Sequence, residues 1–321
     1  MFLRKTLAPA AAGIVLLAGA LALAPAAPCT AQEIVQDEGA AYRAWHEASQ
    51  AADNVKAMAA AKTYLEKYPT GQYADFMKKW LGTAQMTALD AAIKEKRTAD
   101  MITVGREILA GDPENLNVLY ALAFNVRRNE LLASPPNFAN APAAVEFAKK
   151  SISLVESGKT LVGVQNFDKN ATLAWLTQIL AVNEGKNGTA AEAIKLYEKS
   201  TSYAPGDPSI GGLNLLRVFT LRQAAYGDAV KAFNAFPEPD RTAAEPKPEV
   251  KAAMDALNAQ ADALIDAAAG FVAFANAKGL APAMKDRVNQ TLEAVYKSRF
   301  PGDATLDGLK KILAAKGAPG Q

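Results

Sequence analysis

The sequence predicts an all-α fold built from stacked, antiparallel helical hairpins. Alanine is abundant and runs of β-branched residues are short, a composition that favours helices. From about residue 38 to residue 316, apolar residues recur at helical spacing, and no turn dipeptide separates alternating apolar and polar stretches as in a β-hairpin. Proline or glycine interrupts this pattern at intervals. These three observations indicate helices joined by short turns.

The first 31 residues have the three-part pattern of a secretory signal peptide. A short positive start precedes an apolar stretch over residues 8–27, and small and polar residues follow. We expect cleavage after Ala31, because Cys29 and Ala31 place small residues three and one positions before the cut. The mature chain is then expected in the periplasm, with association with the outer membrane as an alternative. It would contain no cysteine, so we expect no disulfide and no thiolate site.

Other interpretations of this segment stay open. A permanent membrane anchor is one, although the run is rich in alanine and is interrupted by Pro9 and Pro25, which makes a poor spanning helix. Lipidation of Cys29, the only cysteine, is another. Residues 26–28 (Ala-Ala-Pro) precede it, so two positions depart from the Leu-(Ala/Ser)-(Gly/Ala)-Cys pattern of lipoproteins. A cut a few residues earlier than Ala31 is also open.

Cleavage would leave a mature chain without net charge. Arg4 and Lys5 are the only charged residues of the first 31, so 35 basic residues less these two leave 33, against 33 acidic residues. Binding to nucleic acid needs basic residues that neutralise phosphates, and binding to anionic lipid needs a polybasic patch. We therefore expect no nucleic-acid partner, and we expect no membrane-spanning segment in the mature chain.

Five turn sequences divide the chain into helical segments. Most combine proline or glycine with Asp or Asn, residues that stop one helix and cap the next. The segments between them hold two helices of roughly a dozen residues each, which is the αα-hairpin arrangement. The turns are Pro69-Thr-Gly71, Gly111-Asp-Pro113, Gly185 to Gly188, Pro205-Gly-Asp-Pro208 and Pro301-Gly-Asp303. Two longer loops, residues 132–142 and 158–170, are expected to serve binding, as insertions in helical stacks often do.

A block of one alanine, a small or aromatic residue four positions later, another three positions after that and a closing proline recurs along the chain. Its clearest copy consists of Ala193, Tyr197, Ser200 and Pro205. An earlier copy consists of Ala57, Ala61, Tyr64 and Pro69, and degenerate copies begin at Met101, Ala144 and Ala229. Such a unit of a few dozen residues decides the architecture, because each unit buries its apolar face only against the next.

The block and the residues after its first copy match a known repeat signature. That signature is W-x2-L-G-x2-Y, then A-x3-F, then P, and Trp80-Leu81-Gly82 follows the first proline. The chain therefore resembles the tetratricopeptide-repeat (TPR) family, in particular its exported bacterial members. Successive copies are 44, 43, 49 and 36 residues apart, mostly longer than the ~34 of the family. A generic stack of helical hairpins is the alternative.

The resemblance implies a right-handed superhelix of αα-hairpins over residues 32–237, with a binding groove lined by the first helix of each hairpin. Residues 238–249, within PEPDRTAAEPKPE, are expected to form a proline-rich linker. Residues 250–316 are expected to form a C-terminal helical hairpin that caps the last repeat, before a tail over residues 317–321. A separate interaction domain is the alternative. The first cap helix carries a coiled-coil-like seam. The seam consists of Met254, Leu257, Ala261, Leu264, Ala268 and Phe271, with Val288, Leu292 and Val295 as its expected partners.

Residues that would support catalysis or metal binding are scarce. His46 is the only histidine, and no Ser or Cys stands in a nucleophile-elbow sequence. One histidine without a mature cysteine cannot build the usual zinc site. Ser157-Gly-Lys-Thr160 resembles the end of a phosphate-binding loop, but Ser153 stands where that motif needs glycine. We therefore expect no catalytic residue, no metal and no cofactor.

The expected binding surface is the concave side of the hairpin stack. Aromatic rings beside two adjacent arginines suit an extended peptide or a carboxylate, which arginine binds with two hydrogen bonds. The expected groove residues are Asn117, Tyr120, Phe124, Arg127, Arg128, Trp175 and Gln178. Alternatively, Tyr120 and Phe124 pack between hairpins, and Arg127 with Arg128 form a pair favoured by the dipole at a helix C-terminus.

The sequence thus predicts a non-enzymatic scaffold or adaptor of the cell envelope that binds protein or peptide partners through a TPR-like groove. A carrier of a small apolar ligand or lipid is a second hypothesis. A continuous apolar groove would favour it, and the adjacent Arg127 and Arg128 count against it. An envelope hydrolase is a third hypothesis, which would need a buried pair of carboxylates.

Overall fold

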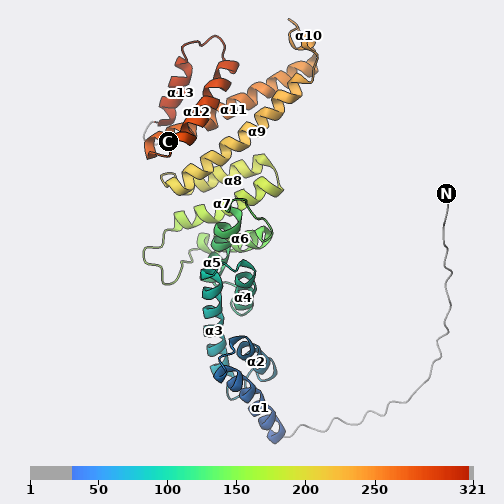
Figure 1. Ribbon diagram of the computed structural model, residues 1–321, viewed down its shortest axis with the longest axis vertical. Coiled ribbons are helices and arrows are strands. Elements are labelled where there is room, and N and C mark those ends of the chain that lie inside the picture. The colour runs from blue at the N-terminus through green and yellow to red at the C-terminus, as the bar shows by residue number, and fades with distance from the viewer. Residues whose placement is uncertain (1–30, 318–321) are drawn as a thin grey trace, which may run out of the picture. The chain divides into compact units, whose positions relative to one another are not determined.

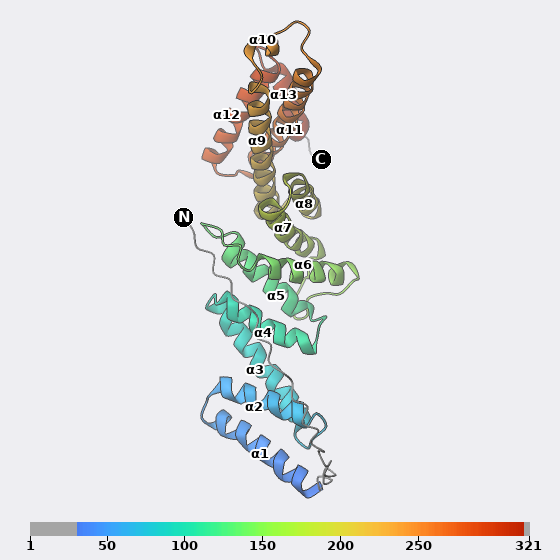
Figure 2. The same ribbon diagram turned by 90° about the vertical axis from the view of Figure 1, so that its right-hand side faces the viewer.

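The computed structural model describes residues 31–317, and the side chains from residue 37 onward. Apart from Ala31 and Gly317, the predicted signal peptide and tail lie outside these residues. The described chain is all-helical, without a strand, which confirms the predicted class (Figure 1, Figure 2). Its elements are α1 (Ala31–Gln50), α2 (Asn54–Lys67), α3 (Ala74–Lys94), α4 (Thr98–Gly111), α5 (Leu116–Val126), η1 (Arg127–Leu131), α6 (Ala141–Glu156), α7 (Lys169–Asn187), α8 (Ala190–Tyr203), η2 (Pro208–Gly212), α9 (Leu213–Asn234), α10 (Glu238–Arg241), α11 (Pro248–Lys278), α12 (Pro282–Arg299) and α13 (Asp307–Gly317), where η1 and η2 are π-helical turns.

All five predicted turns lie at the end of a helix. Three of the elements that follow them begin with a polar cap, which satisfies backbone N–H groups that have no partner within the helix. Before α5, the side chain of Asn115 accepts a hydrogen bond from Val118 N at 3.1 Å. Before α8, the hydroxyl of Thr189 accepts from Glu192 N at 3.2 Å. A third cap lies inside a predicted turn: before η2, the side chain of Asp207 accepts from Ser209 N at 2.8 Å. Asn115 and Thr189 stand just after their predicted turns.

The described chain forms two compact units, unit 1 up to Leu81 and unit 2 from the next residue onward. In unit 1, α1 packs on α2, and the first turns of α3 complete a small core. Ala57, Ala61 and Tyr64, from the first copy of the repeat block, are fully buried. The small residues let the helices approach closely, and the tyrosine ring fills the space beside them.

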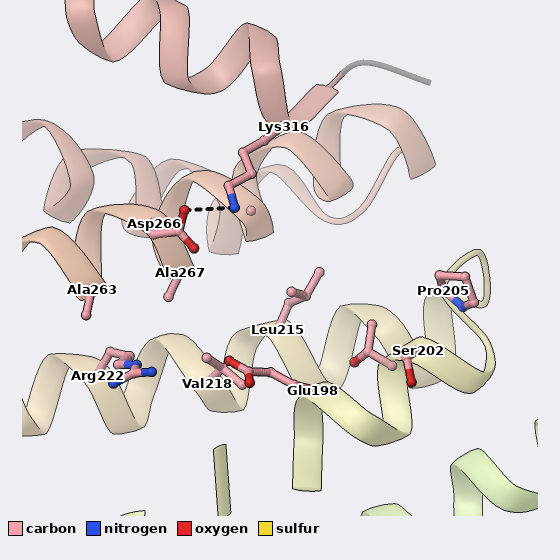
Figure 3. A pocket seen from close by; sticks show the side chains of 12 residues that line it. Glu198, Ser202, Pro205, Leu215, Val218, Arg222, Ala263, Asp266, Ala267 and Lys316 are labelled. Atoms are coloured by element: carbon pink, nitrogen blue, oxygen red, sulfur yellow. Dashed lines mark ion pairs between the residues drawn. The ribbon is translucent and has the colours of Figure 1, made fainter. Parts of the chain in front are cut away.

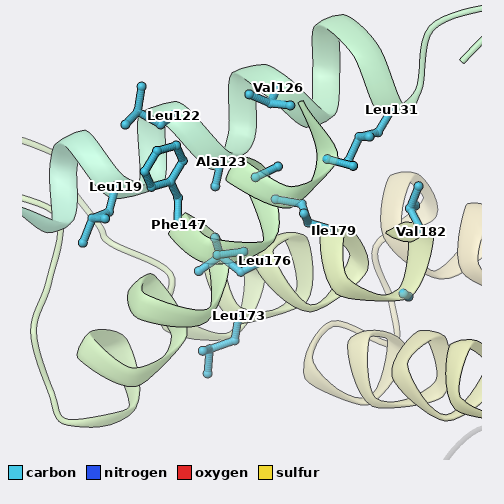
Figure 4. Packing of buried hydrophobic residues seen from close by; sticks show 14 of the residues in the cluster. Leu119, Leu122, Ala123, Val126, Leu131, Phe147, Leu173, Leu176, Ile179 and Val182 are labelled. Carbon is cyan, nitrogen blue, oxygen red and sulfur yellow. The ribbon is translucent and has the colours of Figure 1, made fainter. Parts of the chain in front are cut away.

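Unit 2 is a series of helices in which each packs on the next along the chain. The paired helices are α4 with α5, α5 with α6, α6 with α7, α7 with α8, α8 with α9, and α9 with α11. Ala144 and Ala193, which begin two further copies of the block, are fully buried. The main core lies between α5, α6 and α7, where Leu122, Phe147 and Leu176 meet (Figure 4). The predicted block therefore marks contact faces between helices.

The last predicted copy of the block, at Ala229, does not begin a helix of its own. It lies inside α9, because residues 213–234 form one continuous helix. Gly227, just before it, does not end the helix, because a glycine inside a helix is less favourable than alanine by only about 1 kcal/mol. Ala229, Phe233 and Phe236 are half-buried, so they do not form a close contact face like that of the other copies.

The proline-rich stretch 238–249 was expected to link the repeat domain to a C-terminal cap. In the structure it joins two helices of the same unit. The helices on either side of it, α9 and α11, pack along each other (Figure 2). The stretch contains α10 and an ion pair between Lys247 and Asp240 at 3.2 Å. The division between units lies instead after Leu81, inside α3. A continuous helix carries no sequence signal for such a boundary.

Residues 250–316 form three helices where the sequence predicted two. The seam is buried from Ala261 to Phe271, whereas Met254 and Leu257 are half-buried. The partner residues on α12 are buried as predicted: Val288, Leu292 and Val295. The third helix, α13, buries only Leu309. One buried residue produces a weak helical pattern, which explains why the sequence did not reveal it.

Two turns with similar sequences, TYLEKYPTG and VYKSRFPGD, are built alike. Tyr64 and Tyr296 each stand five residues before a proline, near the ends of α2 and α12. The hydroxyl of Tyr64 accepts a hydrogen bond from Tyr73 N at 2.9 Å, and that of Tyr296 donates to the Asp303 carboxylate at 2.8 Å. Each buried tyrosine thus anchors the segment that follows its proline.

Asp303→Asn is expected to lower the free energy of unfolding at neutral pH, by an amount that decreases in acid. The backbone N–H of Gly308 and the hydroxyl of Tyr296 donate to the Asp303 carboxylate and hold its pKa below the usual range. Because the folded pKa is depressed, the stabilisation is complete above the unfolded value of about 3.9 and is lost as the pH falls through the folded value. Urea unfolding of both proteins across this pH range measures the effect. A difference that stays constant with pH would contradict the expectation.

Candidate functional site

Hydrogen bonds between buried polar side chains connect four elements of unit 2. Gln178 on α7 accepts from Nε of Arg127 on η1 at 2.8 Å, and from Nη2 of the same guanidinium. The Gln178 amide donates to Asn214 on α9 at 2.5 Å, and Asn214 donates to Ser200 on α8 at 2.9 Å. Ser200 in turn donates to the carbonyl of Ala174 on α7 at 2.7 Å. Gln178, Asn214 and Ser200 are fully buried, and Arg127 is 5% exposed.

Arg127 is a buried cation that forms no ion pair with the described residues. Glu130, buried in the same π-helical turn, accepts instead from Asn140 at 2.8 Å. Burial lowers the pKa of Arg127 to about 10, so the guanidinium stays protonated at neutral pH. Its charge is stabilised by the oxygen of Gln178 and by the ring of Trp175, whose centroid lies 4.1 Å from the guanidinium carbon. The negative face of an aromatic ring attracts such a cation.

Three aromatic rings adjoin this arginine. Tyr120 and Phe124 of α5 stack with their centroids 5.6 Å apart, and Phe124 meets Trp175 of α7 edge-on at 6.3 Å. The guanidinium of Arg127 also lies 5.8 Å from the centroid of Phe124. All three rings are half-buried, so each is anchored in the protein and offers part of its surface to solvent. Aromatic side chains held in this way are frequent anchors of binding interfaces.

A loop with exposed apolar residues is attached to α5 one turn before Tyr120. Asn117 stands three residues before Tyr120 on one face of α5. Its amide donates to Val162 O at 2.8 Å and accepts from Val162 N at 2.9 Å. Val162 and Val164 are 79% and 51% exposed. The aromatic strip consists of Tyr120, Phe124, Trp175, Val162 and Val164.

The predicted groove residues lie in one region, but they differ in accessibility. The three aromatic rings are partly exposed, as the groove requires. Arg127 and Gln178 differ from the expectation, because they are buried and bonded to each other and neither side chain is open to a partner. The amide of Asn117 is occupied by the loop. Arg128 is exposed and forms no ion pair or hydrogen bond with the described residues.

Sequence reasoning missed Asn214 and the exposed valines. Asn214 and Arg217 are the two polar residues of the otherwise apolar stretch LNLLRVF, and a short amide in such a stretch indicates a buried hydrogen-bonding group. Its partners stand 36 and 14 residues away in the chain, so spacing does not identify them. Val162 and Val164 belong to the second predicted loop, where the sequence does not distinguish them from the buried Leu161 beside them.

A cleft of about 410 Å³ forms a second candidate site in unit 2 (Figure 3). It lies between α8, α9 and α11, with the last turn of α13 at one side. Leu215 and Val218 of α9 provide apolar walls. Its charged residues are Glu198, Arg222, Asp266 and Lys316. Asp266 and Lys316 form an ion pair at 2.8 Å.

The described residues contain no group of three or more His, Cys, Asp or Glu side chains that could hold a metal ion. His46 is exposed on α1, and its ring stacks on Tyr42 with the centroids 6.3 Å apart. Within residues 31–317, none of the helices combines the length and the apolar character that crossing a membrane requires.

Comparisons with known proteins give no match. No family model matches the chain, and no curated protein and no solved structure matches it. The resemblance to tetratricopeptide repeats therefore rests on the residues named above. A function has to follow from the geometry of the two candidate sites.

Proposed function

We propose that this protein is a non-enzymatic binding module of the cell envelope, which holds a protein or peptide partner on the aromatic strip. Its hairpins would form a TPR-like superhelix with the strip on the inner side, and the N-terminal signal would direct export. The observation that carries this proposal is the set of half-buried rings fixed in place over a buried cation. The buried network gives the strip its rigidity.

The rings are held in position without a partner. The guanidinium of Arg127 is fixed by two hydrogen bonds to Gln178, and Gln178 is fixed by Asn214. The guanidinium therefore stays against Trp175 and restricts that ring. A surface that is already ordered loses little conformational entropy on binding. Arg127 thus acts as a positioning residue, and it does not contact the partner.

The strip fits an extended peptide with apolar side chains. Tyrosine, tryptophan, phenylalanine and arginine are enriched in protein interfaces. Val162 and Val164 add exposed apolar surface on the loop that Asn117 of α5 holds. Arg128, exposed and next in the chain to Arg127, supplies a free guanidinium for an acidic side chain or a terminal carboxylate. The proposed partner therefore combines apolar residues with a carboxylate.

Trp175→Ala is expected to weaken peptide binding at least tenfold. Truncation of an aromatic anchor commonly costs about 2 kcal/mol or more, and about 1.4 kcal/mol corresponds to tenfold in affinity. The immobilised chain from residue 32 onward would select peptides from a displayed random library. The dissociation constants of selected peptides would then be measured for the wild type, Trp175→Ala and Phe124→Ala.

A matched control is Phe236→Ala, which truncates a half-buried aromatic residue after α9, outside the strip. Its peptide affinity is expected to equal that of the wild type. Arg128→Glu is expected to reduce selectively the affinity for peptides that carry a carboxylate. The proposal is wrong if the wild type selects no peptides, or if the selected peptides bind Trp175→Ala and the wild type equally well.

A further inference from the structure

The cleft between α8, α9 and α11 has the size and lining of a site for a small molecule. Its volume is about 410 Å³, within the ~300–1,000 Å³ of typical ligand pockets. Apolar side chains from two helices, Leu215 and Val218 of α9 and Ala267 of α11, line it. It shares no lining residue with the aromatic strip, so it is a separate site.

The open space in this cleft depends on Gly270. This residue lies inside α11, where glycine is less favourable than alanine by about 1 kcal/mol. Packing does not require a glycine here, because an added Cβ would come no closer than 4.0 Å to the nearest side chain, that of Leu215. The missing side chain instead enlarges the cleft, together with Ala267 and Ala263, which lie one and two turns earlier on the same face of α11.

Two opposite charges in the cleft have no partner within residues 31–317. Asp266 and Lys316 neutralise each other at 2.8 Å. Arg222 of α9 is half-buried and Glu198 of α8 is exposed, and neither forms an ion pair or hydrogen bond with the described residues. Figure 3 shows both side chains at the same wall of the cleft. A ligand with one charge would leave the other group unpaired, whereas a zwitterion would satisfy both.

We propose that this cleft binds a small aliphatic zwitterion, namely an amino acid or dipeptide with apolar side chains. The guanidinium of Arg222 binds its carboxylate, because arginine and carboxylate match in geometry and charge. The carboxylate of Glu198 binds its ammonium group. The aliphatic side chains pack on Leu215 and Val218, in the space that Gly270 leaves open.

Calorimetric titration of the chain from residue 32 onward with leucyl-leucine tests this inference. We expect one molecule bound per chain. N-acetyl-leucyl-leucine lacks the ammonium group and leucyl-leucine amide lacks the carboxylate, so each should bind about tenfold more weakly or worse. Arg222→Gln should weaken leucyl-leucine by a similar factor without further weakening the amide. Glu198→Gln should weaken the binding of leucyl-leucine by a similar factor without further weakening that of N-acetyl-leucyl-leucine.

Gly270→Leu should fill the cleft and abolish binding. Its matched control is Gly227→Leu on α9, where an added Cβ meets no atom within 4 Å and the cleft is not involved. Circular dichroism checks that both variants fold. If Gly270→Leu does not fold, the affinity of Arg222→Gln for leucyl-leucine tests the inference instead. The inference is overturned if leucyl-leucine does not bind at millimolar concentration. It is equally overturned if Arg222→Gln or a folded Gly270→Leu binds as the wild type does, or if the two blocked dipeptides bind as tightly as leucyl-leucine.

Discussion

Replacing Gln178 with leucine is expected to lower the free energy of unfolding by about 3–5 kcal/mol. The substitution nearly keeps the size of the side chain, but it removes the only hydrogen-bond acceptor that Arg127 has among the described residues. A buried cation is then left without an acceptor, which is among the largest destabilising changes that one substitution causes. Asn214 also loses the donor to its side-chain oxygen. Urea unfolding followed by circular dichroism measures the change.

Two further variants distinguish the loss of the Arg127–Gln178 hydrogen bonds from a general effect of substitution on stability. Arg128→Ala removes the exposed arginine next in the chain and should change the free energy of unfolding by less than about 0.5 kcal/mol. The double variant Arg127→Met/Gln178→Leu should be more stable than Gln178→Leu alone, because no unpaired charge remains. If the double variant is less stable than the single one, the buried cation is not the source of the instability.

Gly105→Ala is expected to destabilise the wild type and to stabilise a Leu122→Ala variant. An added Cβ at Gly105 on α4 would lie 2.6 Å from both terminal carbons of Leu122 on α5, a fully buried side chain. In the wild type this overpacking should cost about 1–3 kcal/mol. Leu122→Ala alone should cost about 2–5 kcal/mol, because it opens a cavity. In that cavity the added methyl group meets no clash, and alanine favours the helix over glycine by about 1 kcal/mol.

The four proteins of this double-mutant cycle are compared by urea unfolding. Gly227→Ala is the control, since an added Cβ there meets no atom within 4 Å. It should stabilise both backgrounds by about 0.5–1 kcal/mol through helix propensity alone. If Gly105→Ala has the same sign in both backgrounds, α4 and α5 do not touch as closely at this point as the structure indicates.

The helix ends show where sequence reasoning worked and where it could not. The five predicted turns contain proline or glycine, because proline breaks a helix interior and glycine is frequent at helix C-termini. The turns after α1 and α3 contain neither. There the chain reverses at Ala52 and Lys96, both with φ of 56°. A left-handed conformation is unusual for such residues, so their identity carries no turn signal.

The candidate site was predictable where it depends on one helix. Asn117, Tyr120 and Phe124 share a face of α5 because they are spaced by three and four residues. The contact between Phe124 and Trp175 depends instead on the packing of α5 against α7. The bond between Arg127 and Gln178 joins positions 51 residues apart. No local pattern distinguishes such a pair from two exposed polar residues.

Composition and residue spacing are enough to specify the all-helical class, most turns and the small-residue faces on which helices meet. These features depend on spacing along one helix and on the backbone preferences of single residues. Which polar groups are buried depends instead on how the helices pack. Arg127, Gln178 and Asn214 are enclosed where η1, α7, α8 and α9 come together. The same packing leaves the cleft beside Gly270 open. The burial of a side chain depends on which helices lie next to its own. The spacing of residues along one helix does not specify which helices those are.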